Sequence, residues 1–152
     1  MGLRFVYRRF NVRKPIWPLF GRTDRPCPVV NVAVIGPAGT WSGDALLDTG
    51  ADDTVFPDIV AQKTGTNLVH APTGSARGLG STAPSVLRYA EVLLRLTDGR
   101  DFREWPARVG FTNAPLSVAT LGFAGCLEFF VSTFDGNLEQ VELTVNPRYP
   151  GV

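Results

Sequence analysis

Short apolar runs rich in β-branched residues, separated by Gly and Pro, follow one another along most of this 152-residue chain. The run VVNVAVI at residues 29–35 is typical of a buried strand. The run YAEVLLRL at residues 89–96 alternates apolar and polar positions, as a half-buried strand does. Two segments, residues 57–65 and 123–130, are predicted as brief helices; in the first, Pro57 suits the first turn and Gly65 the C-terminal cap. The pattern predicts an all-β fold with one or two short helices.

Turn residues divide the predicted strands into hairpins. Asp-Gly at residues 98–99 is a strong hairpin signal, and the glycine-bearing residues 78–81 are predicted as the tip of another hairpin. Residues 36–43 are predicted as a hairpin loop that leads into a returning strand at residues 44–48. A closing hairpin is predicted over residues 131–145.

The N-terminal segment differs from the rest in its prolines and its charge. Residues 3–10 suit a strand, whereas the proline-rich residues 13–28 are predicted as an extended connection or a sheet edge, because proline has no N–H to donate. Residues 1–25 hold seven Arg and Lys against one Asp, a net charge of +6, and the rest of the chain carries −5. We therefore divide the chain into a basic, aromatic extension at residues 1–27 and a single domain at residues 28–152.

Composition places the chain among ordinary globular proteins. Hydrophobic residues make up 44% and charged residues 19%, and 152 residues can bury a real core. A net charge of +1 gives no global field that favours a nucleic-acid partner. The sequence shows no signal peptide and no transmembrane stretch, so we expect a cytoplasmic protein without a membrane partner. The basic extension could still touch nucleic acid or an anionic membrane, but packing as a strand on the acidic body or at a dimer interface is favoured.

The residues that other hydrolases need are missing from this sequence. Cys27 and Cys126 lie far apart without neighbouring ligands, so free thiols are favoured over one long-range disulfide. His70 is the sole histidine, and there is no G-x-S-x-G motif, so serine, cysteine and zinc hydrolysis all lack parts. We expect neither a metal nor a cofactor.

The stretch DALLDTGADDTVF, residues 44–56, begins apolar and then presents acids at Asp48, Asp52 and Asp53. A carboxylate is costly to bury without a partner, so an Asp at the end of a buried strand needs an explanation.

The run ALLDTGADDTV closely resembles the active-site loop of retropepsin-like, or retroviral-type, aspartic proteases. The glycine-bearing hairpin at residues 78–81 follows where that family has its flap, and VATLG at residues 118–122 resembles the strand beneath the loop. The resemblance covers roughly residues 28–145, and its ending is more similar to bacterial than to viral members. It implies an all-β acid-protease barrel and an aspartic endopeptidase acting on peptides or proteins. In such an enzyme two carboxylates share one proton and one water, because like charges a few ångström apart cannot both ionise. Since this chain has one Asp-Thr-Gly triplet after an apolar strand, the resemblance implies a homodimer in which the second Asp48 comes from a second copy.

The resemblance also implies roles for individual residues. The catalytic residues that it implies are Asp48, Thr49 and Gly50, with a hydrogen bond from Thr49 across the two-fold axis. Substrate binding falls to the loop, the flap and the strand beneath: Ala51, Asp52, Asp53, Val55, Gly78, Leu79, Gly80, Ser81 and Leu121. Phe123 departs from the viral pattern, which has an Arg there paired with an acid like Asp52. An Arg of the N-terminal cluster is a candidate replacement.

Two other interpretations stay open. The same fold could hold peptides without cutting them, as a catalytically inactive binding or dimerisation module, which Phe123 and the glycine-poor flap motivate. Alternatively, the basic residues 1–25 could lie in or near an acidic groove and inhibit it until they are trimmed.

Overall fold

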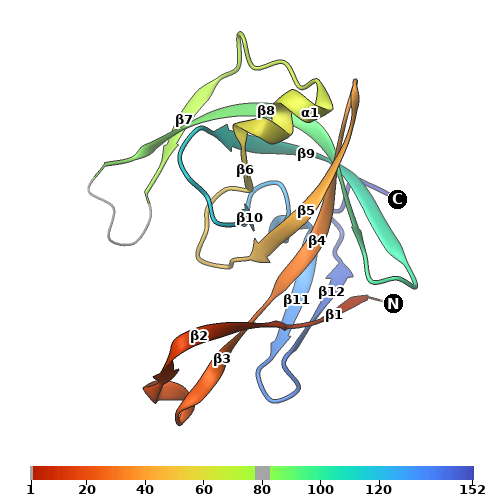
Figure 1. Ribbon diagram of the computed structural model, residues 1–152. Helices are drawn as coiled ribbons and strands as arrows, with labels where there is room; N and C mark the ends of the chain where they lie inside the picture. The colour runs from red at the N-terminus through yellow and green to blue at the C-terminus, as the bar shows by residue number, and fades with distance from the viewer. Residues whose placement is uncertain (1, 78–82) are drawn as a thin grey trace.

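The computed structural model describes residues 2–77 and 83–152, and the fold built from them is dominated by strands (Figure 1). Only one α-helix and two 3-10 turns accompany these strands in the described ranges. In chain order the elements are β1 (Leu3–Val6), β2 (Arg8–Ile16), η1 (Trp17–Leu19), β3 (Arg22–Cys27), β4 (Val29–Gly36), β5 (Gly39–Leu47), β6 (Val55–Pro57), α1 (Asp58–Thr64), β7 (Thr73–Ala76), β8 (Ser85–Thr97), β9 (Phe102–Thr112), β10 (Ala119–Leu121), η2 (Leu127–Phe129), β11 (Phe130–Asp135) and β12 (Gln140–Val145). The all-β prediction is confirmed.

The main sheet closes on itself. Its strand order is β4-β5-β10-β6-β9-β8-β7, and β4 also pairs with β8, so that six of these strands form a barrel with β7 as an added edge. Because the sheet closes through β4 and β8, each of the six barrel strands is paired on both sides and none of them is an open edge. The short β10 lies between β5, to which it is parallel, and β6, to which it is antiparallel.

Alternating apolar residues of these strands fill the barrel interior. In β8, for example, Val92, Leu94 and Leu96 are buried while the residues between them are exposed. The ring of Trp105 on β9 packs edge-on against Phe130, with the ring centroids 5.2 Å apart. Fully burying such aromatic side chains stabilises the fold by roughly 1.5–3 kcal/mol each.

The predicted helix is confirmed, with its ends close to where the sequence places them. Helix α1 runs over Asp58–Thr64, Pro57 is its N-cap, and Gly65 ends it in the left-handed conformation at φ 70°. The predicted second helix at residues 123–130 is reduced to the single 3-10 turn η2.

The predicted loop at residues 36–43 is wrong in its extent. β4 and β5 pair up to Gly36 and Gly39, which leaves only Pro37 and Ala38 as the turn. A Cβ on Gly36 would lie 2.3 Å from the Thr64 carbonyl oxygen, so this glycine lets the end of α1 approach the hairpin.

The N-terminal segment forms two elements in two different sheets. β1 pairs antiparallel with β12 in a three-stranded sheet with β11, and Leu3 is fully buried there. The prediction that this segment packs as a strand on the body is thus confirmed for β1. The predicted single strand at residues 3–10 is interrupted at Tyr7, whose N–H donates to the Glu139 carbonyl (2.7 Å).

The predicted connection at residues 13–28 belongs, up to Cys27, to a hairpin rather than to a plain connection. β2 pairs antiparallel with β3 in a two-stranded sheet of its own, with an irregularity between Asn11 and Ile16. Pro15 lies at this irregularity, and both strands are sheet edges, where a missing N–H is tolerated. The alternative of an edge is therefore the right one. The division of the chain at residue 27 stays a prediction.

Candidate active site

Asp48 stands at the end of β5, where the strand leaves the core. Ala45 and Leu47 are buried, whereas Asp48 is half-buried and Thr49 and Gly50 are exposed. The carboxylate is therefore not driven into the interior as the apolar run alone indicates. The Asp48 N–H donates to the Leu121 carbonyl (3.1 Å), which extends the β5–β10 pairing by one residue and fixes where Asp48 emerges.

One oxygen of the Asp48 carboxylate is already held by its own loop. Oδ1 accepts the Gly50 N–H at 2.9 Å, and the Asp48 carbonyl accepts the Ala51 N–H at 3.2 Å. These bonds form a tight Asx-type turn over the triplet, and they orient the carboxylate relative to the loop backbone. The other oxygen, Oδ2, has no hydrogen bond within the described chain and is free to bind water or a second carboxylate.

The rest of the loop is bonded to the segment that follows β10. The Phe123 N–H donates to the Ala51 carbonyl (2.9 Å), and the Ala124 N–H donates to the Asp52 carbonyl (2.8 Å). The Thr54 N–H in turn donates a hydrogen bond to the Ala124 carbonyl (3.1 Å). The loop is therefore braced by backbone bonds over most of its length, which favours a preorganised site over a mobile one.

Two residues that the sequence did not single out make this brace possible. Thr54 is fully buried, and its Oγ1 accepts the Gly122 N–H at 3.2 Å. Gly122 has no room for a side chain, because a Cβ there would lie 2.3 Å from the Asp53 carbonyl oxygen and 2.7 Å from that of Ala51. In the sequence, Gly122 is marked only as the last residue of VATLG, the segment that resembles the strand beneath a retropepsin loop. Thr54 is marked only by its place in ALLDTGADDTV.

Asp52 and Asp53 differ in their surroundings. The Asp53 carboxylate accepts a hydrogen bond from the Tyr89 hydroxyl (2.9 Å), which joins the loop to β8. Burial, and then this bond to Asp53, raise the pKa of Tyr89, so the phenol stays protonated and donating at neutral pH. Asp52 is exposed, and its carboxylate has no bond or ion pair within the described residues. The expected Arg of the N-terminal cluster therefore does not hold Asp52 within the same chain.

The other predicted substrate-binding residues fall into three groups. Ala51 is half-buried on the loop, beside Phe123, which is 54% exposed. Val55 and Leu121 are buried beneath the loop, so their side chains have little or no surface in this chain to offer a substrate. The predicted flap residues Gly78, Leu79, Gly80 and Ser81 lie outside the described residues. The strands β7 and β8 that flank them pair antiparallel, as a hairpin requires.

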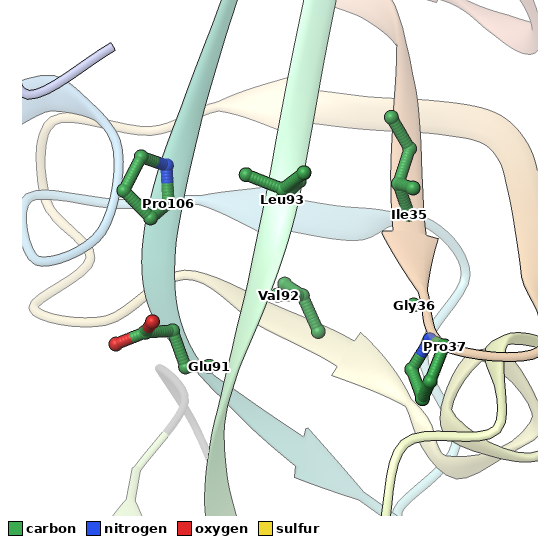
Figure 2. Close-up of a pocket in the computed structure, with 7 residues that line it drawn as sticks. All are labelled: Ile35, Gly36, Pro37, Glu91, Val92, Leu93 and Pro106. Carbon is green, nitrogen blue, oxygen red and sulfur yellow. The ribbon is translucent and has the colours of Figure 1, made fainter.

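Three features of the described residues lie away from the loop. An open hollow between the end of β4 and the middle of β8 is lined by residues that lie outside the loop at residues 48–54 (Figure 2): Ile35, Gly36, Pro37, Glu91, Val92, Leu93 and Pro106. In residues 2–77 and 83–152, no three His, Cys, Asp or Glu side chains form a group that could hold a metal ion. Cys27 and Cys126 are both free thiols.

No helix in the described part of the chain is long and apolar enough to cross a membrane. The expected cytoplasmic location stays a prediction.

Comparisons with known proteins find a likeness at the level of the fold. No family model matches the sequence, and no curated protein matches it. Among solved structures, the chain is similar to a retropepsin-like aspartic protease from Rickettsia conorii, with a TM-score of 0.55 and 17% sequence identity. The match covers 94% of this chain and 91% of that chain, so the likeness concerns the whole fold rather than a fragment. The chain therefore has the all-β fold of a retropepsin-like aspartic protease.

Proposed function

We propose that this chain is an aspartic endopeptidase that acts as a homodimer. One observation carries the proposal: Asp48 leaves β5 half-buried, with Oδ1 held by the Gly50 N–H and Oδ2 free, on a loop braced by backbone bonds. A carboxylate that is fixed in place, yet open to solvent on one side, is suited to hold a water molecule. The retropepsin-like fold supports the same function.

The chemistry requires two such carboxylates. With one proton shared between them, the ionised carboxylate takes a proton from the attacking water, while the protonated one gives its proton to the oxygen of the scissile carbonyl. The second Asp48 comes from a second copy related by a two-fold axis. The Thr49 hydroxyl has no bond within the described residues, so it is available to bond across that axis.

The substrate in this proposal is an extended peptide. It lies along the loop and pairs its backbone as an added strand, with Gly50 allowing close approach. Ala51, Asp52 and Asp53 line the path next to the reacting carbonyl, and the hairpin carried by β7 and β8 covers it. Val55 and Leu121 shape the groove from below. The groove is acidic, since the Asp52 carboxylate lacks a partner in the described chain.

Replacing Asp48 with Asn tests the proposal directly. Asp48→Asn keeps the size of the side chain and its acceptor oxygen for the Gly50 N–H, but it removes the group that exchanges protons. Cleavage of a peptide library, measured between about pH 4 and about pH 8, should fall at least about a thousandfold while the thermal unfolding curve stays unchanged. Pepstatin should inhibit the wild-type activity.

Asp135→Asn is the matched control. Asp135 has a glycine close behind it, as Asp48 does, and also accepts backbone N–H groups in a turn, from Asn137 and Leu138 at 2.9 Å each, but it lies on the β11–β12 hairpin. This variant should cleave normally. Full peptidase activity in Asp48→Asn would refute the proposal.

A second candidate function is peptide binding without cleavage. Phe123, 54% exposed beside the loop where the viral pattern has Arg, favours it, because an apolar surface there suits binding more than charge pairing. Under this alternative the wild type binds library peptides without turning them over, and Asp48→Asn binds them equally well. Turnover that pepstatin abolishes would reject this alternative.

A further inference from the structure

The β2–β3 hairpin, residues 8–27, forms a sheet of its own; we call it the arm. Within the described residues its two strands pair only with each other, and Figure 1 shows the arm projecting from the barrel at the lower left. Arg9 and Arg22 form ion pairs with Glu139 at the β11–β12 turn, but no third strand extends the ribbon. A two-stranded ribbon without a third strand is marginally stable in water.

The tip of the arm carries two aromatic side chains that are exposed to solvent. Trp17 is 89% exposed and Phe20 102% exposed, at either end of the 3-10 turn η1, whereas Trp105 in the core is fully buried. Side chains of this kind are enriched where proteins bind proteins, and they account for much of the affinity when a partner buries them.

The charge of the arm complements that of the rest of the chain. Residues 8–27 hold six Arg and Lys against one Asp, a net charge of +5, so the remaining residues carry a net −4. Three of these cations, Arg13, Lys14 and Arg25, are exposed and have no ion-pair partner among the described residues. A second copy of this chain offers an acidic body to these cations.

The arm begins next to the candidate active site. The Leu47 N–H, one residue before Asp48, donates to the Pro28 carbonyl (3.0 Å), and Arg8 at the base of the arm pairs with Asp44 on β5. β3 has six residues and β2 is irregular between Asn11 and Ile16, so the paired arm is about 20 Å long, somewhat more than the radius of gyration of about 15 Å expected for such a chain. A copy whose Asp48 meets this Asp48 lies within its reach.

We propose that the arm clasps a second copy of the chain, with Trp17 and Phe20 docked on the partner's body and the free cations facing its acidic surface. The inference rests on the proposed function in one respect, that the candidate site is incomplete without a second copy. An anionic membrane or a nucleic acid would also attract the basic tip. The base of the arm lies beside Asp48, which favours the second copy that the proposed site needs as the occupant.

The first test measures dimerisation without any reference to cleavage. Sedimentation velocity over a range of concentrations compares the wild type with the double variant Trp17→Ser/Phe20→Ser. Because both side chains are solvent-exposed, the variant should fold normally. Its dimer dissociation constant should rise at least about 30-fold. Val69→Ser, which removes another exposed apolar side chain (78% exposed), is the control and should leave dimerisation unchanged.

The second test addresses charge. Arg13→Glu/Arg25→Glu should weaken the dimer, and raised salt should weaken the wild-type dimer, because exposed charges are screened within about 10 Å. Arg100→Glu, at the exposed β8–β9 turn, is the control.

A benzophenone amino acid replacing Phe20 should photo-cross-link two chains, whereas the same group replacing Val69 should not.

The outcomes separate the arm from the proposed activity. A wild type that is monomeric throughout, or tip variants that dimerise like the wild type, would overturn the inference. So would binding to phosphatidylserine vesicles or to DNA that the tip variants lose while dimerisation stays unchanged. If the wild type dimerises through the tip yet cleaves nothing at any concentration, the arm stands and the proposed protease function fails.

Discussion

At the scale of single residues, the candidate site depends on groups that hold Asp48 rather than on Asp48 alone. The triplet ends β5, but the loop keeps its shape because Thr54 and Gly122 lock it to the segment after β10. The sequence points to Asp48 through an apolar run that ends in a carboxylate. Thr54 and Tyr89 could not be found in that way, because their roles lie in contacts with residues 68 and 36 positions away.

Thr54→Val tests this brace. Valine has the shape of threonine but no acceptor, so the buried Gly122 N–H loses its partner, which should cost about 1–3 kcal/mol of unfolding free energy. Cleavage should fall at least about tenfold, since small misplacements of a reacting group are costly. Urea unfolding and peptide cleavage, measured on the same samples, check both expectations.

The control for Thr54→Val is Thr112→Val, which removes another buried hydroxyl that accepts a backbone N–H, here that of Ala114 (3.1 Å). It should also lose stability, but it should cleave normally once folded. If both variants lost activity in equal measure, Thr54 would have no specific role at the loop.

At the scale of elements, the barrel follows from the sequence more closely than the N-terminal hairpin does. The apolar run of β4, the Pro57 and Gly65 signals of α1 and the Asp98-Gly99 turn all appear in the structure, because each is encoded locally. The β2–β3 hairpin could not be predicted with the same ease, because its prolines are untypical of strands. They are tolerated here because both strands are sheet edges. The break at Tyr7 could not be predicted, since its backbone partner is Glu139, far along the chain.

That hairpin is held to the β11–β12 turn by charges. Arg22 donates to Glu139 (2.7 Å) and to Asp24 (2.9 Å), and Arg9 pairs with Glu139 at 3.1 Å. The hydrogen bond from Arg22 is the main cause that lowers the pKa of both carboxyls from their ordinary values of 4.5 and 3.8. The hairpin is therefore attached to the body through groups that titrate in acid.

Lowering the pH should loosen this attachment. A carboxyl whose pKa is depressed in the folded state stabilises that state above its unfolded pKa, and the contribution disappears as the pH falls through the folded pKa. Amide protection in residues 8–27, measured by hydrogen exchange and corrected for intrinsic rates, should therefore decline below about pH 4, while the barrel amides stay protected.

Glu139→Gln should loosen the hairpin already at neutral pH. Glu142→Gln, which breaks the pair with Arg4 on the adjacent β1, is the control; loosening of the hairpin to the same extent in both variants would contradict the assignment.

At the scale of the whole molecule, three features bear on the proposed dimer. The described chain has one Asp-Thr-Gly triplet on a braced loop, an unbonded Thr49 hydroxyl and an arm whose two strands pair only with each other. The proposed two-fold partner accounts for each of them. The sequence could predict the need for a second carboxylate, but not the arm, because the exposure of Trp17 and Phe20 depends on how the hairpin stands on the barrel.

Mixing wild type with Asp48→Asn tests whether two chains share one site. Total protein is held constant, at a concentration where sedimentation shows dimers, and half of it is replaced by the variant. Random pairing then leaves about one quarter of the dimers with two intact carboxylates, so activity should fall to about one quarter. If each chain acted alone, activity would fall only to about one half. Replacing half with Asp135→Asn should leave activity unchanged, because that residue is outside the loop. A quarter of the activity in the first mixture and full activity in the second would mean that catalysis needs Asp48 from both chains, which no arrangement within one chain can reproduce.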